Sequence, residues 1–151
     1  MLPDFDDRGF LPPGEHPATW KEVVERFGGN PTRDRLLIGL ERAIILLRQA
    51  GCPRIWLDGS FVSNKLEPRD FDGCFDRCDI TSLDERLYPP FRLQQREQKR
   101  DFGGELFPAE AVARIESGDV RVSYRRFFQR HRTGEPKGIV VLEIGSWELK
   151  H

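Results

Sequence analysis

The sequence has few of the residues on which disulfide-stabilised and zinc-binding proteins depend. Its 151 residues include only three cysteines and three histidines. The acidic N-terminus lacks a secretory pattern, and an odd number of cysteines does not suit a closed disulfide framework. Cys74 and Cys78 are spaced C-x3-C, but Cys52 and the histidines supply no second ligand pair for zinc. We therefore expect free thiols and a cytoplasmic protein.

Long hydrophobic runs and an excess of charge of either sign are also missing. The most apolar segment, residues 36–47, is interrupted by Glu41 and Arg42. It therefore falls short of the roughly 18 apolar residues that span a bilayer, and we expect no membrane segment. Basic and acidic residues number 24 and 25, so the net charge of −1 predicts no partner by itself. Binding of nucleic acid would require a local basic patch.

The length and hydrophobic content are typical of one soluble domain with an extended N-terminal arm. Prolines punctuate residues 1–18, so we expect that arm there and a single domain over residues 19–151. Capping residues, hydrophobic periodicity and β-branched runs place the remaining elements. Helices are predicted at 20–27, 31–50, 91–99 and 124–132, with a short one from Phe61, and strands at 54–57, 71–75, 105–107 and 138–144.

The segment from Leu57 to Asp72 is the most informative part of the chain. Gly59 lacks a Cβ and lets the backbone approach a ligand, and Ser60 adds a hydroxyl group and an amide that can bind phosphate. Asp70 and Asp72 are two residues apart, so on a strand they point to the same side. Adjacent carboxylates repel each other unless a cation lies between them, and Mg²⁺ prefers oxygen ligands. The plainer alternative is a strand-exit turn followed by two surface aspartates.

The same residues resemble the signature of nucleotidyltransferases of the DNA polymerase beta superfamily. In that signature an apolar residue is followed by Gly, then Gly or Ser, a spacer, and Asp-apolar-Asp. The one departure is Asp58, which lies between the apolar run and the glycine. The chain is similar to minimal members of the superfamily, some of which are antitoxins paired with HEPN-type toxins. It is also similar to a bacterial group with this core, through Leu11–Gly14, Phe127–Gln129 and Pro136–Ile139.

The resemblance implies an α/β (α+β) fold with a mixed sheet flanked by helices. It also implies transfer of a nucleoside monophosphate from an NTP, such as ATP, to an acceptor hydroxyl group on a toxin or an RNA. In this interpretation Gly59 and Ser60 hold the triphosphate, and Asp70 and Asp72 hold two Mg²⁺ ions. The superfamily adds a third carboxylate, for which Glu105 is the first candidate and Glu143 the rival.

Several cations have both a functional and a plain interpretation. Lys65 and Arg69 lie between the two halves of the motif, where they can neutralise phosphate or simply be exposed loop residues. The resemblance also suggests that Lys137 approaches the phosphates. Arginines of the 121–132 segment surround aromatic residues, which suits RNA binding or a helix with its aromatic side chains packed inward.

Two further functional hypotheses compete with the enzyme. In the first, the domain has lost catalysis and neutralises a partner toxin by contact, as an antitoxin or binding module. In the second, the chain binds RNA through the 121–132 segment. Fold resemblance alone does not choose among them.

Overall fold

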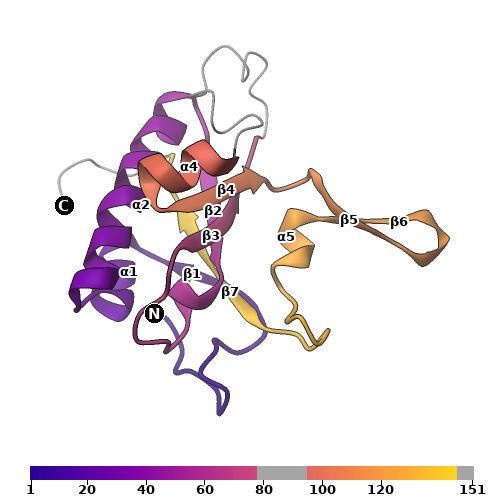
Figure 1. Ribbon diagram of the computed structural model, residues 1–151, viewed down its shortest axis with the longest axis horizontal. Helices are drawn as coiled ribbons and strands as arrows, with labels where there is room; N and C mark the ends of the chain where they lie inside the picture. The colour runs from indigo at the N-terminus through magenta and orange to yellow at the C-terminus, as the bar shows by residue number, and fades with distance from the viewer. Residues whose placement is uncertain (78–94, 146–151) are drawn as a thin grey trace.

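A mixed five-stranded sheet forms the centre of the computed structural model, which describes residues 1–77 and 95–145 (Figure 1). The strand order is β1-β7-β2-β3-β4. β1 and β7 pair in parallel, as do β3 and β4, whereas β2 runs antiparallel to both of its neighbours. The α+β class and the mixed sheet are therefore confirmed. The strands are β1 (Gly14–Ala18), β2 (Arg54–Asp58), β3 (Phe71–Phe75), β4 (Gly104–Pro108) and β7 (Gly138–Glu143).

The first two helices begin where their capping residues predict. Thr19 and Glu22 form a reciprocal capping box at the start of α1 (Trp20–Phe27). Asn30 accepts a hydrogen bond from the Arg33 amide, and Pro31 opens α2 (Pro31–Gln49). Further along the described part of the chain are α4 (Gln95–Phe102) and α5 (Tyr124–Phe127). Among the described helices, none is long and apolar enough to cross a membrane.

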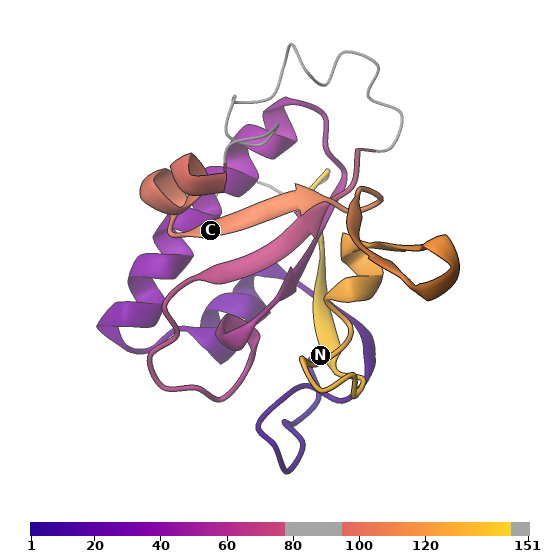
Figure 2. The ribbon, with the colours of Figure 1, turned by 45° about the vertical axis from the view of Figure 1, so that its right-hand side comes forward.

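The two faces of the sheet have different coverings. Helices α1, α2 and α4 pack on one face, and α5 lies on the other (Figures 1 and 2). Side chains alternate between the faces along each strand. Ile55 and Leu57 therefore point into the larger core under the helices, while Trp56 joins the smaller core with Cys74 and Phe128. The next residue on the face of Trp56 is Asp58, so this face changes from apolar to acidic at one end of β2.

Several elements differ from the sequence prediction. The N-terminal segment is extended, but its last residues form β1 at the edge of the sheet, and Leu2 and Leu11 are buried in the core. The helix predicted at 124–132 ends at Phe127, because the chain must turn at 131–135 to enter β7. Residues 91–94 of the helix predicted at 91–99, and Cys78, lie outside the described residues.

A two-stranded hairpin was not predicted. It consists of β5 (Val112–Glu116) and β6 (Val120–Ser123), which pair antiparallel and stand apart from the main sheet (Figures 1 and 2). Between the strands, Gly118 adopts φ +75° and Asp119 adopts φ +59°. Ile115 and Val120 are exposed in it. Neither strand has the buried apolar face that a sequence pattern reveals.

An ion pair joins α5 to the edge strand β1. The Arg125 guanidinium donates two hydrogen bonds, of 2.6 and 2.7 Å, to the Glu15 carboxylate, and it lies 4.6 Å from the centre of the Trp56 ring. These hydrogen bonds hold the pKa of Glu15 below its usual value. The pair connects the two sides of the smaller core.

The pH dependence of stability provides a test of this pair. Folding lowers the pKa of Glu15. The ion pair therefore stabilises the protein fully above the pKa that Glu15 has in the unfolded chain, and this stabilisation is lost as the pH falls through the lower pKa of the folded state. We expect Glu15→Gln to reduce the free energy of unfolding by about 0.5–1 kcal/mol at pH 7, a value that allows for solvent screening of a half-exposed pair. Urea unfolding at about pH 3, below the usual pKa of glutamate, should show a smaller difference from wild type than at pH 7.

Glu25→Gln is the matched control for Glu15→Gln. Glu25 is an exposed glutamate whose nearest cation, Lys21, is 3.9 Å away. This control should change stability little at either pH. If Glu15→Gln lowered the free energy of unfolding equally at both pH values, the stabilisation would come from the shape of the Glu15 side chain and not from its charge.

Candidate functional site

Three carboxylates lie in a row across neighbouring strands. Asp58 on β2 is paired with Asp72 on β3, and Asp72 is paired with Glu105 on β4. Paired residues on adjacent strands share one face of the sheet, so all three face the same side. Asp70 precedes β3 by one residue. We call Asp58, Asp70, Asp72 and Glu105 the carboxylate floor.

The position of Asp58 was missed by sequence reasoning, which treated it as an interruption of the motif. It is the last residue of β2 and only 5% exposed. The useful signal was the alternation Trp56-Leu57-Asp58, which places Asp58 on the face of Trp56. Glu143, the rival third carboxylate, is at the other end of the sheet. It pairs with Arg54 at the start of β2, at an Nε to Oε1 distance of 2.6 Å.

Two lysines neutralise most of the carboxylate floor. Lys137 Nζ is 3.0 Å from Asp58 Oδ1. Lys99 Nζ lies 3.3 Å from Asp70 Oδ2 and 3.0 Å from Glu105 Oε1, so it bridges β4 and the loop before β3. Within the described residues, Asp72 has no such ion-pair partner. The charge of Asp72 is therefore the least compensated of the four.

Burial and crowding of negative charge act together on Asp72. They raise its pKa to about 7, with burial as the largest cause, followed by the charges of Asp70, Asp58 and Glu105. Burial also raises the pKa of Asp58, although the Lys137 ammonium opposes this effect. A carboxylate with a pKa near neutrality can exchange protons at physiological pH, and such groups cluster at functional sites.

The Gly59-Ser60 turn lies against these acids. Gly59 adopts φ +82°, and a Cβ added to it would lie 3.0 Å from Asp72 Oδ2. The position therefore requires glycine for its backbone conformation and for close approach to the carboxylate. Ser60 opens the short 3-10 helix η1 (Ser60–Val62), where a short helix was predicted.

A buried arginine organises the loop after this turn. The Arg33 side chain, 6% exposed, donates hydrogen bonds to the carbonyl oxygens of Phe61 (2.7 Å), Ser63 (2.8 Å) and Lys65 (2.5 Å). A further bond of 3.0 Å reaches the carbonyl oxygen of Phe27 in α1. Burial lowers the pKa of this guanidinium. Among the described residues this guanidinium pairs with no carboxylate, and its hydrogen bonds to backbone carbonyl groups fix the path of the chain from Phe61 to Lys65.

The floor opens into a large cleft, with a volume of about 1560 Å³. Single small-molecule pockets are usually roughly 300–1,000 Å³, so the space exceeds that needed for one nucleotide. The predicted residues Gly59, Ser60, Lys65, Arg69, Asp70 and Asp72 all line it. Glu105 joins them through the shared Lys99 and its register with Asp72. The opposite side carries four arginines, which we call the basic wall: Arg114, Arg126, Arg130 and Arg132.

Most aromatic side chains near the basic wall pack inward. The Tyr124 ring stacks on Phe107 with centroids 4.2 Å apart, and Phe128 is 8% exposed. This packing matches the plain interpretation of the 121–132 segment for those two residues. Phe127 differs, because it is 39% exposed and lines the cleft.

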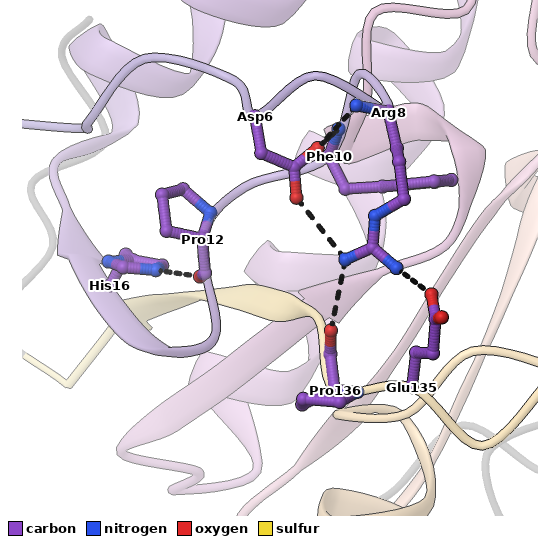
Figure 3. Close-up of polar contacts among 7 residues, drawn as sticks. All are labelled: Asp6, Arg8, Phe10, Pro12, His16, Glu135 and Pro136. Carbon is purple, nitrogen blue, oxygen red and sulfur yellow. Dashed lines mark hydrogen bonds and ion pairs between the residues drawn. The ribbon is translucent and has the colours of Figure 1, made fainter.

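The N-terminal segment forms one rim of the cleft, because Phe10, Pro13 and Gly14 line it. Arg8 contacts both the Glu135 carboxylate and the carbonyl oxygen of Pro136, and the Arg8 guanidinium also donates a hydrogen bond to the Asp6 carboxylate (Figure 3). The Gly9 carbonyl oxygen accepts a hydrogen bond of 2.9 Å from the Asn64 amide on the other side. Residues 6–12 therefore join the loop after η1 to the turn before β7.

The chemistry of the floor suits a hard divalent cation, although a complete ligand set is not assembled. Its donors are carboxylate oxygens, which Mg²⁺ prefers. Across residues 1–77 and 95–145, however, no three His, Cys, Asp or Glu side chains are grouped closely enough to hold a metal ion. The ammonium groups of Lys99 and Lys137 lie beside these oxygens instead. The donor types therefore fit Mg²⁺, and the two lysines compete for them.

The buried Arg33 yields a test of the loop architecture. We expect Arg33→Lys to lower the free energy of unfolding by about 3 kcal/mol, because one ammonium group cannot replace a fork that reaches several carbonyl groups. Arg35→Lys, an exposed exchange on the same helix, should change stability by less than about 0.5 kcal/mol. Urea denaturation of both variants provides the measurement. Equal stability of the two variants would show that the carbonyl contacts of Arg33 are dispensable.

Comparison with known proteins gives a family but no functional relative. No curated protein and no solved structure matches the chain. One protein family does match, over residues 3–143, which include every element of the main sheet and the whole carboxylate floor. The chain therefore belongs to a family of unknown function, DUF6932.

Proposed function

We propose that the protein transfers a nucleoside monophosphate from an NTP to an acceptor hydroxyl group, and that its core is a nucleotidyltransferase fold. The observation that carries this proposal is the carboxylate floor beside the Gly59 turn, at the base of a cleft lined by cations. Acids that attract a metal ion and cations that attract phosphate are the two requirements of phosphoryl-group chemistry. Here both line one cleft, although the motif that predicted them covers little of the sequence.

Each group has a defined part in this reaction. The Gly59-Ser60 turn, Lys65 and Arg69 bind the triphosphate. The acceptor oxygen attacks the α-phosphorus, the bond from that phosphorus to the bridging oxygen of the β-phosphate breaks, and pyrophosphate leaves. Glu105, which is paired with Asp72 across β3 and β4, helps to take the proton of the acceptor hydroxyl group. Mg²⁺ held by Asp70, Asp72 and Glu105 would supply charge neutralisation on the phosphates.

Calorimetric titration with NTPs tests the proposal. We expect binding that requires Mg²⁺ and is weakened at least tenfold by Asp70→Asn/Asp72→Asn, because the substituted amides no longer attract the ion. Glu143→Gln is the matched control, since it removes a carboxylate from the same sheet at its other end. Absence of NTP binding in the folded wild-type protein would contradict the proposal. So would equal losses in the test and control variants.

A second candidate function is a non-catalytic antitoxin or binding module, which acts by contact on a protein partner such as a HEPN-type toxin. The observation that favours it is the pairing of Asp58, Asp70 and Glu105 with lysines. An acidic site whose charges are already balanced has less need of a metal ion. This function predicts that Asp70→Asn/Asp72→Asn leaves partner binding intact in a pull-down experiment, with no transfer of nucleotide to the partner.

A further inference from the structure

The cleft has a local charge opposite to that of the chain. Seven lysine or arginine residues line it against four aspartate or glutamate residues, whereas the whole chain has a net charge of −1. The charges are also unevenly distributed. Asp58 and Asp72 lie on the sheet and Asp70 directly precedes β3, whereas the arginines of the basic wall lie on the hairpin and on the segment that follows it, with Glu116 as the one acid of the described lining on that side. Figure 2 shows α5 and the hairpin beside the sheet as separate elements.

The arginines of the basic wall are available to a ligand. All four are exposed, and among the described residues none forms an ion pair with a carboxylate. Arg125 differs from these four arginines. It lies in α5 next to Arg126, but its guanidinium is already paired with the Glu15 carboxylate. Unpaired arginines on one surface repel each other unless an anion neutralises them. Their planar guanidinium groups match the geometry of phosphate oxygens.

The size and composition of this surface exceed what a triphosphate needs. Lys65 and Arg69, near the Gly59 turn, already supply cations for an NTP. The basic wall adds four more along a cleft of about 1560 Å³. The exposed Phe127 lies among these arginines and offers a ring on which a base can stack. Repeated phosphates and stacking bases together characterise single-stranded nucleic acid.

We infer that the basic wall binds a single-stranded polynucleotide, with phosphates on Arg114, Arg126, Arg130 and Arg132 and a base on Phe127. That the bound strand is the acceptor rests on the proposed nucleotidyl transfer. That the basic wall binds the strand requires neither NTP nor metal. A strand held there runs beside the carboxylate floor, so one of its hydroxyl groups can reach the nucleotide.

Fluorescence anisotropy with a labelled single-stranded RNA of about ten nucleotides tests the binding, without NTP or divalent metal. Four phosphate contacts predict a slope of log K against log salt of about −3, or roughly a fiftyfold loss of affinity between 50 and 200 mM salt. Arg126→Gln/Arg132→Gln should weaken binding at least tenfold at low salt and reduce the slope by about 1.4. Phe127→Ala should weaken binding with the slope unchanged.

Arg35→Gln/Arg48→Gln is the control pair, since it removes the same charge from α2 on the covered face of the sheet. Absence of salt-dependent RNA binding, or equal effects of the test and control pairs, would overturn the inference. So would equally tight binding of an acidic peptide, which would assign the basic wall to a protein partner. A different result separates the two proposals. If the wild-type protein binds no NTP, the transfer reaction is refuted. If RNA binding is also unchanged by Asp70→Asn/Asp72→Asn, this inference stands.

Discussion

Repulsion among four neighbouring carboxylates is the constraint on which the cleft depends. Strand register places Asp58, Asp72 and Glu105 side by side, so the fold itself creates the electrostatic problem. Lys99 comes from α4 and Lys137 from the residue before β7, so two separate elements that follow β3 in the sequence supply the countercharge. Removal of either lysine would leave uncompensated charge near the core. The site and the fold therefore share one electrostatic balance.

The sheet separates stability from chemistry by its two faces. One face lies under α1, α2 and α4 and contributes to the larger core. The other is apolar only where α5 and Phe128 cover it, and it becomes acidic where that cover ends. The alternation of side chains along β2 contributes to both faces, because the side chains of the consecutive residues Leu57 and Asp58 point to opposite sides of the sheet. The cleft is therefore formed without any insertion into the sheet. It begins where α5 no longer covers this face.

The elements that sequence predicted well were those with strong local signals. Thr19 and Asn30 marked the helix starts through side-chain capping, and the β-branched run from Gly138 marked β7. The spacing of Gly59, Ser60, Asp70 and Asp72 predicted that these residues lie close together, and in the structure they line one cleft. Lys137 meets Asp58, and Lys99 meets Asp70, across long sequence distances, which no local pattern encodes. The hairpin was missed because its strands have no buried face, and β1 because its identity as a strand depends on pairing with β7.

The position of β7 has a consequence for the order in which the protein folds. β7 is the last strand of the described residues, yet it lies between β1 and β2 and pairs with both. Until residues 138–143 have left the ribosome, β1 has no neighbour in the sheet and Lys137 cannot reach Asp58. Contacts between such distant segments carry a large loop-closure entropy and form late. A nascent chain would thus display its acidic strand ends before the lysine that neutralises Asp58 arrives, so the cleft is completed only when β7 joins the sheet.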